Sequence, residues 1–239
     1  MHLNTVLYPS TIENLNIGTV CYYPGMTRKR LTREESRDQT RQRLLDAALK
    51  LIARKGLAGT SVEDIAGAAG YTRGAFYSNF GGKNDLFIEL LRRDHERATA
   101  ELHELLDNDL PIEQIQARTR QMYGQLYRDN ECFMNWTEAR MLAARDTKFR
   151  AKLNALLAEK RTQIAGFIEY FHERAGAPPQ VPPTAMAMGF MSLMEGVKLS
   201  MLSSPADMTP EAAESVLTLF LNSVMQLARI QGEERTSKT

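Results

Sequence analysis

A short segment near the start of the chain gathers hydrogen-bonding side chains at closely spaced positions. Thr72, Arg73 and Tyr77 lie close together, and Gly74 between them would let the backbone approach another surface. A guanidinium can donate two parallel hydrogen bonds to one guanine edge, which makes Arg73 the best candidate for a base contact. Lys83 stands where a long helix is expected to begin, so its ammonium and the helix N-terminus would bind one phosphate together. These residue types and spacings favour contacts with nucleic acid.

Two short helices with a tight turn between them would position this segment. Thr60-Ser61-Val62-Glu63 predicts a capping box in which Thr60 and Glu63 satisfy exposed backbone amides at a helix start. That helix is expected to end at Gly70, whose positive φ would suit a tight turn. Thr72 would cap the second helix, which turns its apolar residues inward: Ala75, Phe76 and Phe80. The pair predicts a helix-turn-helix, with an ordinary helical hairpin as the alternative.

The charges of the chain are unevenly distributed. The net charge is only +1, yet residues 26–85 carry 12 Lys and Arg against 7 Asp and Glu, and residues 86–239 carry 18 against 21. A basic module would meet a polyanion, and a mildly acidic body would not. A solvated basic helix is the alternative interpretation of this pattern.

The remaining chain has helical periodicity throughout, and clear strand alternation is absent. Apolar positions predict helices over 35–55, 86–107, 112–128, 131–144, 148–174 and 184–202, and a last helix from 210. No run of 18 apolar residues occurs, so a membrane span is not expected. Two cysteines are typical of a reduced intracellular protein. Residues 1–25 lack a basic start and an apolar core, so we expect either a disordered arm or translation from Met26.

Several motifs recur together in an order and spacing that resemble a known family. They are TRQRLLDAA at 40–48, Gly56, TSVEDIA at 60–66, GYTRGAFYSNF at 70–80 and KNDLF at 83–87. Together they resemble the DNA-binding domain of the TetR family of bacterial transcriptional regulators. The resemblance implies an all-α chain of about nine helices. Its parts would be a disordered extension (1–34), a three-helix helix-turn-helix domain (35–82), a ligand-binding and dimerisation domain (83–232) and a disordered tail (233–239).

The same resemblance implies roles for individual residues. Those expected in the major groove are Thr72, Arg73 and Gly74, and those expected at phosphates are Thr60, Ser61, Tyr77, Asn79 and Lys83. Tyr77 has a thymine methyl as its alternative contact. Asn79 stands where the family often has His, and Gly81-Gly82 stands where Pro or Ser is common, which would loosen the joint to the next helix.

The body of the chain offers residues for a small-molecule site. The aromatic candidates Phe133, Trp136, Phe167 and Phe171 could line an apolar pocket, and Arg140 could orient a polar ligand group. Core packing and a solvated helix face are the alternatives. The methionine-rich segment 184–202 and the last helix would form a dimer interface. The sequence contains no phosphate-binding glycine loop, nucleophile elbow or metal-binding cluster.

The sequence therefore predicts a cytoplasmic homodimeric repressor that a small apolar or amphipathic effector releases from a palindromic operator in double-stranded DNA. It predicts no catalysis, no cofactor, no metal and no membrane association. Two alternatives remain: a DNA-binding activator or architectural protein that needs no effector, and a small-molecule-binding protein or enzyme on a helical body.

Overall fold

The structure, a computed structural model, describes residues 32–107, 129–174 and 181–220 together with a few isolated positions between 110 and 223. The first part holds α1 (Arg33–Lys55), α2 (Val62–Ala68), α3 (Arg73–Tyr77) and α4 (Lys83–Asp107). The second holds α6 (Asn130–Arg145) and α7 (Thr147–Arg174), and the third holds α8 (Pro183–Ser203) and the helical residues 210–220.

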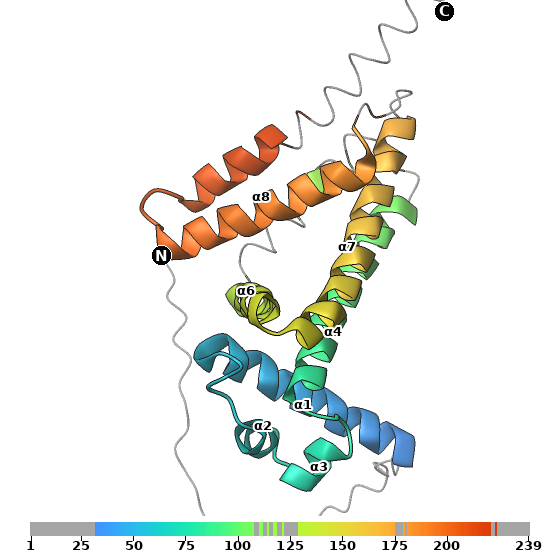
Figure 1. Cartoon of the computed structure of the whole chain (residues 1–239). Helices are drawn as coiled ribbons and strands as arrows, with labels where there is room; N and C mark the ends of the chain where they lie inside the picture. The colour runs from blue at the N-terminus through green and yellow to red at the C-terminus, as the bar shows by residue number, and fades with distance from the viewer. Residues whose placement is uncertain are drawn as a thin grey trace, which may run out of the picture.

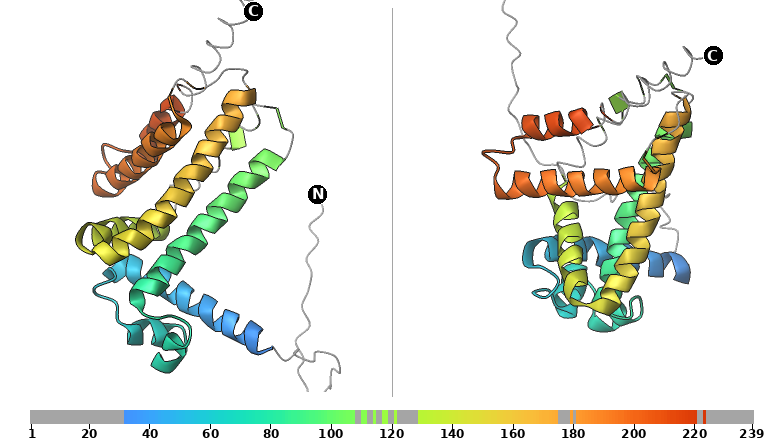
Figure 2. Two further views of the ribbon diagram at one scale, coloured as in Figure 1. Left: turned by 45° about the vertical axis from the view of Figure 1, so that its right-hand side comes forward. Right: turned by 45° about the horizontal axis from the view of Figure 1, so that its top comes forward.

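The helices divide the molecule into a head, a middle and a far end. The head consists of α1, α2 and α3 (Figure 1). From the head, α4 runs the length of the molecule beside α7, and α8 crosses the far end together with residues 210–220 (Figures 1 and 2). Because α4 contacts α1 of the head as well as α6 and α7, it connects the head to the middle as one continuous helix.

Side-chain caps fix where the head helices begin. Thr32 and Glu35 form a capping box at the start of α1, and Gly56 ends that helix with a φ of 72°. At α2 the box is formed by Ser61 and Asp64, with both hydrogen bonds 3.0 Å long. The predicted Thr60–Glu63 box is therefore wrong by one residue. Both pairs have suitable side chains, and the burial of Thr60 leaves Ser61 as the cap.

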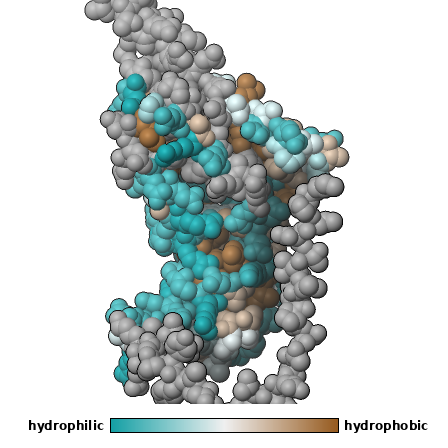
Figure 3. Space-filling model, turned by 180° about the vertical axis from the view of Figure 1, so that it is seen from behind, coloured by the Kyte–Doolittle hydropathy of each residue, from teal (hydrophilic) through white to brown (hydrophobic). Residues whose placement is uncertain are grey.

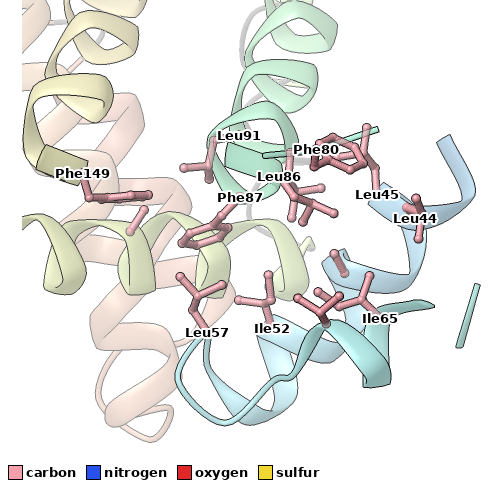
Figure 4. Packing of buried hydrophobic residues seen from close by; sticks show 14 of the residues in the cluster. Leu44, Leu45, Ile52, Leu57, Ile65, Phe80, Leu86, Phe87, Leu91 and Phe149 are labelled. Carbon is pink, nitrogen blue, oxygen red and sulfur yellow. The ribbon is translucent and has the colours of Figure 1, made fainter. Parts of the chain in front are cut away.

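One apolar core joins the head to the middle of the molecule. Leu44, Ile52 and Ile65 of the head pack in the same cluster as Phe87 of α4 and Phe149 of α7 (Figure 4). Phe76 of α3 and residues of α6 belong to this cluster as well. Phe87 of α4 and Phe149 of α7 stack at its centre, with ring centroids 5.8 Å apart. The head is therefore not a separately packed unit, because its core continues into the body.

The far end is packed less deeply and exposes apolar side chains. A small cluster of Val197, Ala213 and Leu217 joins α8 to residues 210–220, and the rings of Phe190 and Phe220 stack. Large apolar residues remain exposed here: Met188, Leu199, Leu202 and Leu219. The back view shows apolar surface between hydrophilic areas, including at this end (Figure 3).

Alone among the helices of the described part, α8 is long and apolar enough to cross a membrane by length and composition. Only 22% of its most apolar window is buried. A search for 18 consecutive apolar residues misses this helix. Glu195 and Lys198 interrupt the apolar run, although the helix as a whole stays apolar.

The all-α prediction is confirmed, and where the structure describes the ends of a predicted helix, the predicted bounds agree with it to within a few residues. Seven labelled helices and residues 210–220 lie in the described part, close to the nine predicted. The predicted N-terminal extension (apart from its last residues), most of the helix over 112–128 and the predicted tail lie outside the described residues. The predicted domain limits stay predictions.

Candidate nucleic-acid interface and internal pocket

Helix α3 is held in place by one face and exposes the other. Phe76 is fully buried and contacts the ring of Phe80. Thr72 caps the helix by accepting a hydrogen bond from the amide of Ala75 (3.3 Å). Gly70 supplies the turn before it with a φ of 77°, as predicted. The opposite face of α3 is exposed and includes three of the predicted contact residues: Arg73, Gly74 and Tyr77.

Neighbouring side chains hold Arg73 across the joint between the two short helices. Its guanidinium lies 2.7 Å from the carboxylate of Glu63 on α2 and 5.5 Å from the ring centroid of Tyr77. The Arg73 side chain is 65% exposed and Glu63 is 57% exposed. An ion pair this exposed contributes little stability, so Arg73 can exchange Glu63 for another acceptor.

Two of the predicted phosphate contacts on this surface have other partners in the structure. Thr60 is buried, and its hydroxyl donates to the carbonyl of Gly56 (2.8 Å), so Thr60 does not belong to the exposed surface. Asn79 is half-buried, and its amide donates to the carbonyl of Ala75 (2.8 Å). Ser61 stays half-exposed at the start of α2. The spacing placed these residues in the right loops but could not tell which way each side chain turns.

Lys83 connects the start of α4 to the loop between α1 and α2. Its ammonium donates to the carbonyls of Leu57 (2.8 Å) and Thr60 (2.6 Å). These bonds orient the two short helices relative to α4. The predicted phosphate clamp overlooked them, because the acceptors are carbonyls that only the tertiary fold brings close.

Arg41 is a positioning residue that the sequence analysis overlooked. It donates to the carbonyl of Asn79 (2.9 Å), pairs with Glu89 of α4 (2.9 Å) and covers the ring of Phe80. It therefore joins α1, the end of α3 and α4 at one point. Its position four residues before Leu45 on α1 gave no sign of these contacts.

A cavity of about 150 Å³ lies between α4, α6, α7 and α8. Of the predicted ligand residues, Phe133 and Trp136 line it. Arg140 instead pairs with Glu195 of α8. Phe167 and Phe171 pack with Leu102 in a separate cluster beside the cavity. Two of the five residues predicted to line an apolar pocket in the body therefore line this cavity.

The cavity also contains charged groups that the sequence analysis did not select. Asp94 accepts hydrogen bonds from the indole of Trp136 (2.7 Å) and from Arg97 (3.0 Å). Lys160 of α7 lies over the Trp136 ring, 4.5 Å from its centroid. Burial lowers the pKa of Lys160, while the nearby Asp94 carboxylate acts in the opposite direction. These groups come from α4, α6 and α7 and form one polar corner.

Burial favours the uncharged forms of the histidine and the cysteine that line the cavity. His95 is buried, and this burial lowers its pKa. Burial, with the Asp94 carboxylate nearby, raises the pKa of the Cys132 thiol. A protonated thiol is a poor nucleophile, so this site offers no activated cysteine. The described residues also contain no cluster of side chains that could hold a metal ion.

Helix α6 contacts both the cavity and the head. Trp136 and Phe133 face the cavity, while Glu138 accepts a hydrogen bond from the amide of Leu57 (2.9 Å) and Asn135 donates to the carbonyl of Leu49 (3.1 Å). A second cavity, of about 290 Å³, lies between α1, α4 and α6 and shares Trp136 and Asp94 with the first. A displacement of α6 at the first cavity would therefore move the groups that bond to α1 and to the loop after it.

The sequence is similar both to a family model and to individual known proteins. Residues 44–90 match the model for bacterial regulatory proteins of the tetR family. The regulator AcrR of Shigella flexneri is 49% identical over 61 residues, which are 26% of this chain and 28% of AcrR. The repressor AcnR of Corynebacterium efficiens is 28% identical over 142 residues, covering 56% of this chain and 74% of AcnR.

Similarity of the whole fold extends further than similarity of sequence. A TetR-family transcriptional regulator from Rhodococcus sp. has a TM-score of 0.68 and 25% identity, covering 79% of this chain and 99% of that one. The strong sequence matches are concentrated in the head, and this chain spans little more than a quarter of the length of AcrR.

Proposed function

The chain belongs to the TetR family of bacterial regulatory proteins, and on that premise we propose that it is a DNA-binding transcriptional repressor released from its operator by a small molecule. The observation that carries the proposal is α3, which buries Phe76 and exposes Arg73, Gly74 and Tyr77 on one face. A second helix of a helix-turn-helix uses such a face to contact base edges in the major groove.

We assign the contacts on this surface from the observed side-chain positions. Arg73 leaves Glu63 and contacts a guanine, while Thr72 and Tyr77 contact the groove or its phosphates. Ser61 and the first amides of α2 contact a phosphate. Lys83 acts mainly by positioning, since two carbonyls already accept from its ammonium. Thr60 makes no contact with DNA.

The exposed ion pair of Arg73 leads to a first prediction. Glu63→Gln removes a negative charge from the DNA-facing surface and frees Arg73, so it should tighten DNA binding by up to about fivefold, the value of an exposed ion pair. Fluorescence anisotropy with labelled duplex measures the change. Glu159→Gln is the matched control, because Glu159 forms a similar pair with Arg92 in the body. Unchanged or weaker binding by Glu63→Gln would contradict the assignment.

We propose that α8 and residues 210–220 form a homodimer interface. Their exposed apolar residues, Met188, Leu199, Leu202 and Leu219, form a surface that a second copy would cover. A dimer interface explains the apolar composition of α8 without a membrane. The charged residues of α8 pack on the body of the protein, since Glu195 pairs with Arg140 and Lys198 donates to Asn130 of α6. Two-fold symmetry then requires an inverted-repeat operator with half-sites about one helical turn apart. Such a regulator acts in the cytoplasm, where the DNA is.

The cavity favours an effector over the effector-independent alternative. A volume of about 150 Å³ suits a molecule of roughly the size of benzene. A ligand there contacts Trp136 on α6 and Asp94 on α4, and both helices reach the head. Release requires that the ligand bind the DNA-incompetent state more tightly than the competent one. We propose no enzymatic activity, because none of these contacts activates a nucleophile.

The test is selection of bound fragments from sheared DNA of the source organism, followed by sequencing. We expect enrichment of a short inverted repeat whose half-sites are about one helical turn apart. Enrichment without a motif would indicate an architectural role instead. No enrichment at low salt by protein freed of ligand would overturn the proposal.

A further inference from the structure

The polar corner of the 150 Å³ cavity contains a lysine, Lys160, that has no hydrogen-bond acceptor among the described residues. The Lys160 ammonium lies over the ring of Trp136, and no carboxylate, carbonyl or hydroxyl oxygen of the described residues accepts from it. The ring face attracts the cation but cannot replace the hydrogen bonds that water gives an ammonium. A group entering the cavity with acceptor atoms would complete this site.

Three of the four carboxylates that line the same cavity are already engaged, and the fourth, Glu101, is exposed. Asp94 accepts from Trp136 and Arg97, and Glu195 accepts from Arg140. Asp129 caps α6 through the amide of Cys132, and its other oxygen lies 3.5 Å from Arg97. Among the lining carboxylates, Glu101 alone has no partner in the described part of the chain, and its exposure weakens any pairing with a cationic ligand.

A second unused donor lies one helical turn from Lys160. Gln163 accepts a hydrogen bond from the hydroxyl of Thr99 (2.7 Å) through its side-chain oxygen, and its amide nitrogen has no acceptor in the described part of the chain. Positions three apart on a helix face the same side. Lys160 and Gln163 therefore present donors together toward the cavity they both line.

The cavity also has an apolar wall, separate from its polar and charged lining residues. This wall is formed by Leu102, Phe133, Ile164, Phe190, Met191 and Met194. Such a wall accommodates a ring or a short hydrocarbon body, and methionine side chains adapt to its shape. The cavity thus combines a donor-rich corner with an apolar wall at benzene-like size.

We propose that the effector is a small apolar carboxylic acid whose carboxylate binds Lys160 and Gln163 and whose hydrocarbon body lies against the apolar wall. This assignment rests on the proposed function, because it names the effector class of the same pocket. An anion supplies the hydrogen bonds that the ammonium of the half-buried Lys160 lacks and offsets the cost of partly desolvating its charge.

The test compares three probes of one size with different polar groups: benzoate, benzyl alcohol and benzylamine. The chain has a single tryptophan, Trp136, so its fluorescence reports binding in either of the two cavities that it lines. Lys160 lines the first cavity and not the second, so its substitution identifies which cavity the probe occupies. We expect saturable binding of benzoate, at least tenfold tighter than benzyl alcohol, with benzylamine the weakest. Equal affinities, tighter binding of the amine, or no saturation by benzoate below about 10 mM would overturn the proposal.

A substitution isolates the role of the lysine. Lys160→Met keeps an apolar stem against Trp136 and removes the ammonium, so benzoate should bind at least tenfold more weakly while benzyl alcohol is unaffected. Lys152→Met on the same helix is the control, because Lys152 pairs with Asp85 outside the cavity. Equal losses for both probes would indicate a merely structural lysine and overturn the assignment.

The two proposals fail separately. Binding of ligand-free protein to an inverted repeat is measured without any probe, and its absence overturns the repressor function alone. Benzoate preference is measured without DNA, and its absence overturns the anion site alone.

Discussion

Replacing Arg73 by alanine is expected to weaken operator binding by about 1–3 kcal/mol, which is roughly 5- to 150-fold in affinity. The guanidinium stands on the exposed face of α3, where the exposed Glu63 and the ring of Tyr77 hold it. Breaking this exposed ion pair costs little free energy when Arg73 moves to DNA. Truncation to alanine, in contrast, removes the whole bidentate contact with guanine.

A base contact and a phosphate contact by Arg73 are distinguished by the sequence dependence of the loss. Anisotropy titrations with operator and scrambled duplex should show that Arg73→Ala lowers the ratio of the two affinities. Arg73→Lys keeps the charge but loses the planar fork, so it should retain binding to scrambled DNA while losing most of the preference. Arg145→Ala, which removes the same charge from the exposed end of α6, is the control. An equal loss on both duplexes would place Arg73 on a phosphate.

The sequence predicts the head well because local signals agree there. Gly70, Thr72 and Phe76 mark a turn, a cap and a buried anchor within a few residues, and the structure has each of them. Such features depend on backbone conformation and helical period, which a local sequence determines. Ser61 in place of Thr60 shows the limit of this approach, because two adjacent residues could serve equally as the cap.

Prediction of the pocket fails where contacts join distant segments. Lys160 and Asp94 meet at Trp136 from three different helices, which no periodicity reveals. Phe167 and Phe171 do continue the helical stripe of Lys160 and its neighbours. Each residue advances about 1.5 Å along a helix, however, so these rings lie past Ile164, and they pack in a separate cluster with Leu102. The spacing of apolar residues identifies which face of a helix is buried. It does not show how far along the helix each packing partner lies.

The continuous core leads to the largest expected effect on stability. Phe149 of α7 stacks on Phe87 of α4 in the cluster that also contains Phe76 of α3. Phe149→Ala should lower the free energy of unfolding by about 3–5 kcal/mol, through lost burial and a cavity at the centre. For a chain of this length, this corresponds to a decrease in Tm of roughly 6–20 °C.

The position of Phe149 in the body makes the variant a test of how the head is held. If head and body share one core, thermal unfolding followed by circular dichroism at fixed protein concentration should remain a single transition, and DNA binding should be lost at that same lower temperature. Met141→Ala, at a side chain that is 49% exposed, is the control and should change the free energy of unfolding by less than about 0.5 kcal/mol. Two separate transitions, with the head still folded after the body has melted, would contradict a shared core. The coupling of an effector site to α3 would then have to pass through the hydrogen bonds of α6 alone, from Glu138 to Leu57 and from Asn135 to Leu49.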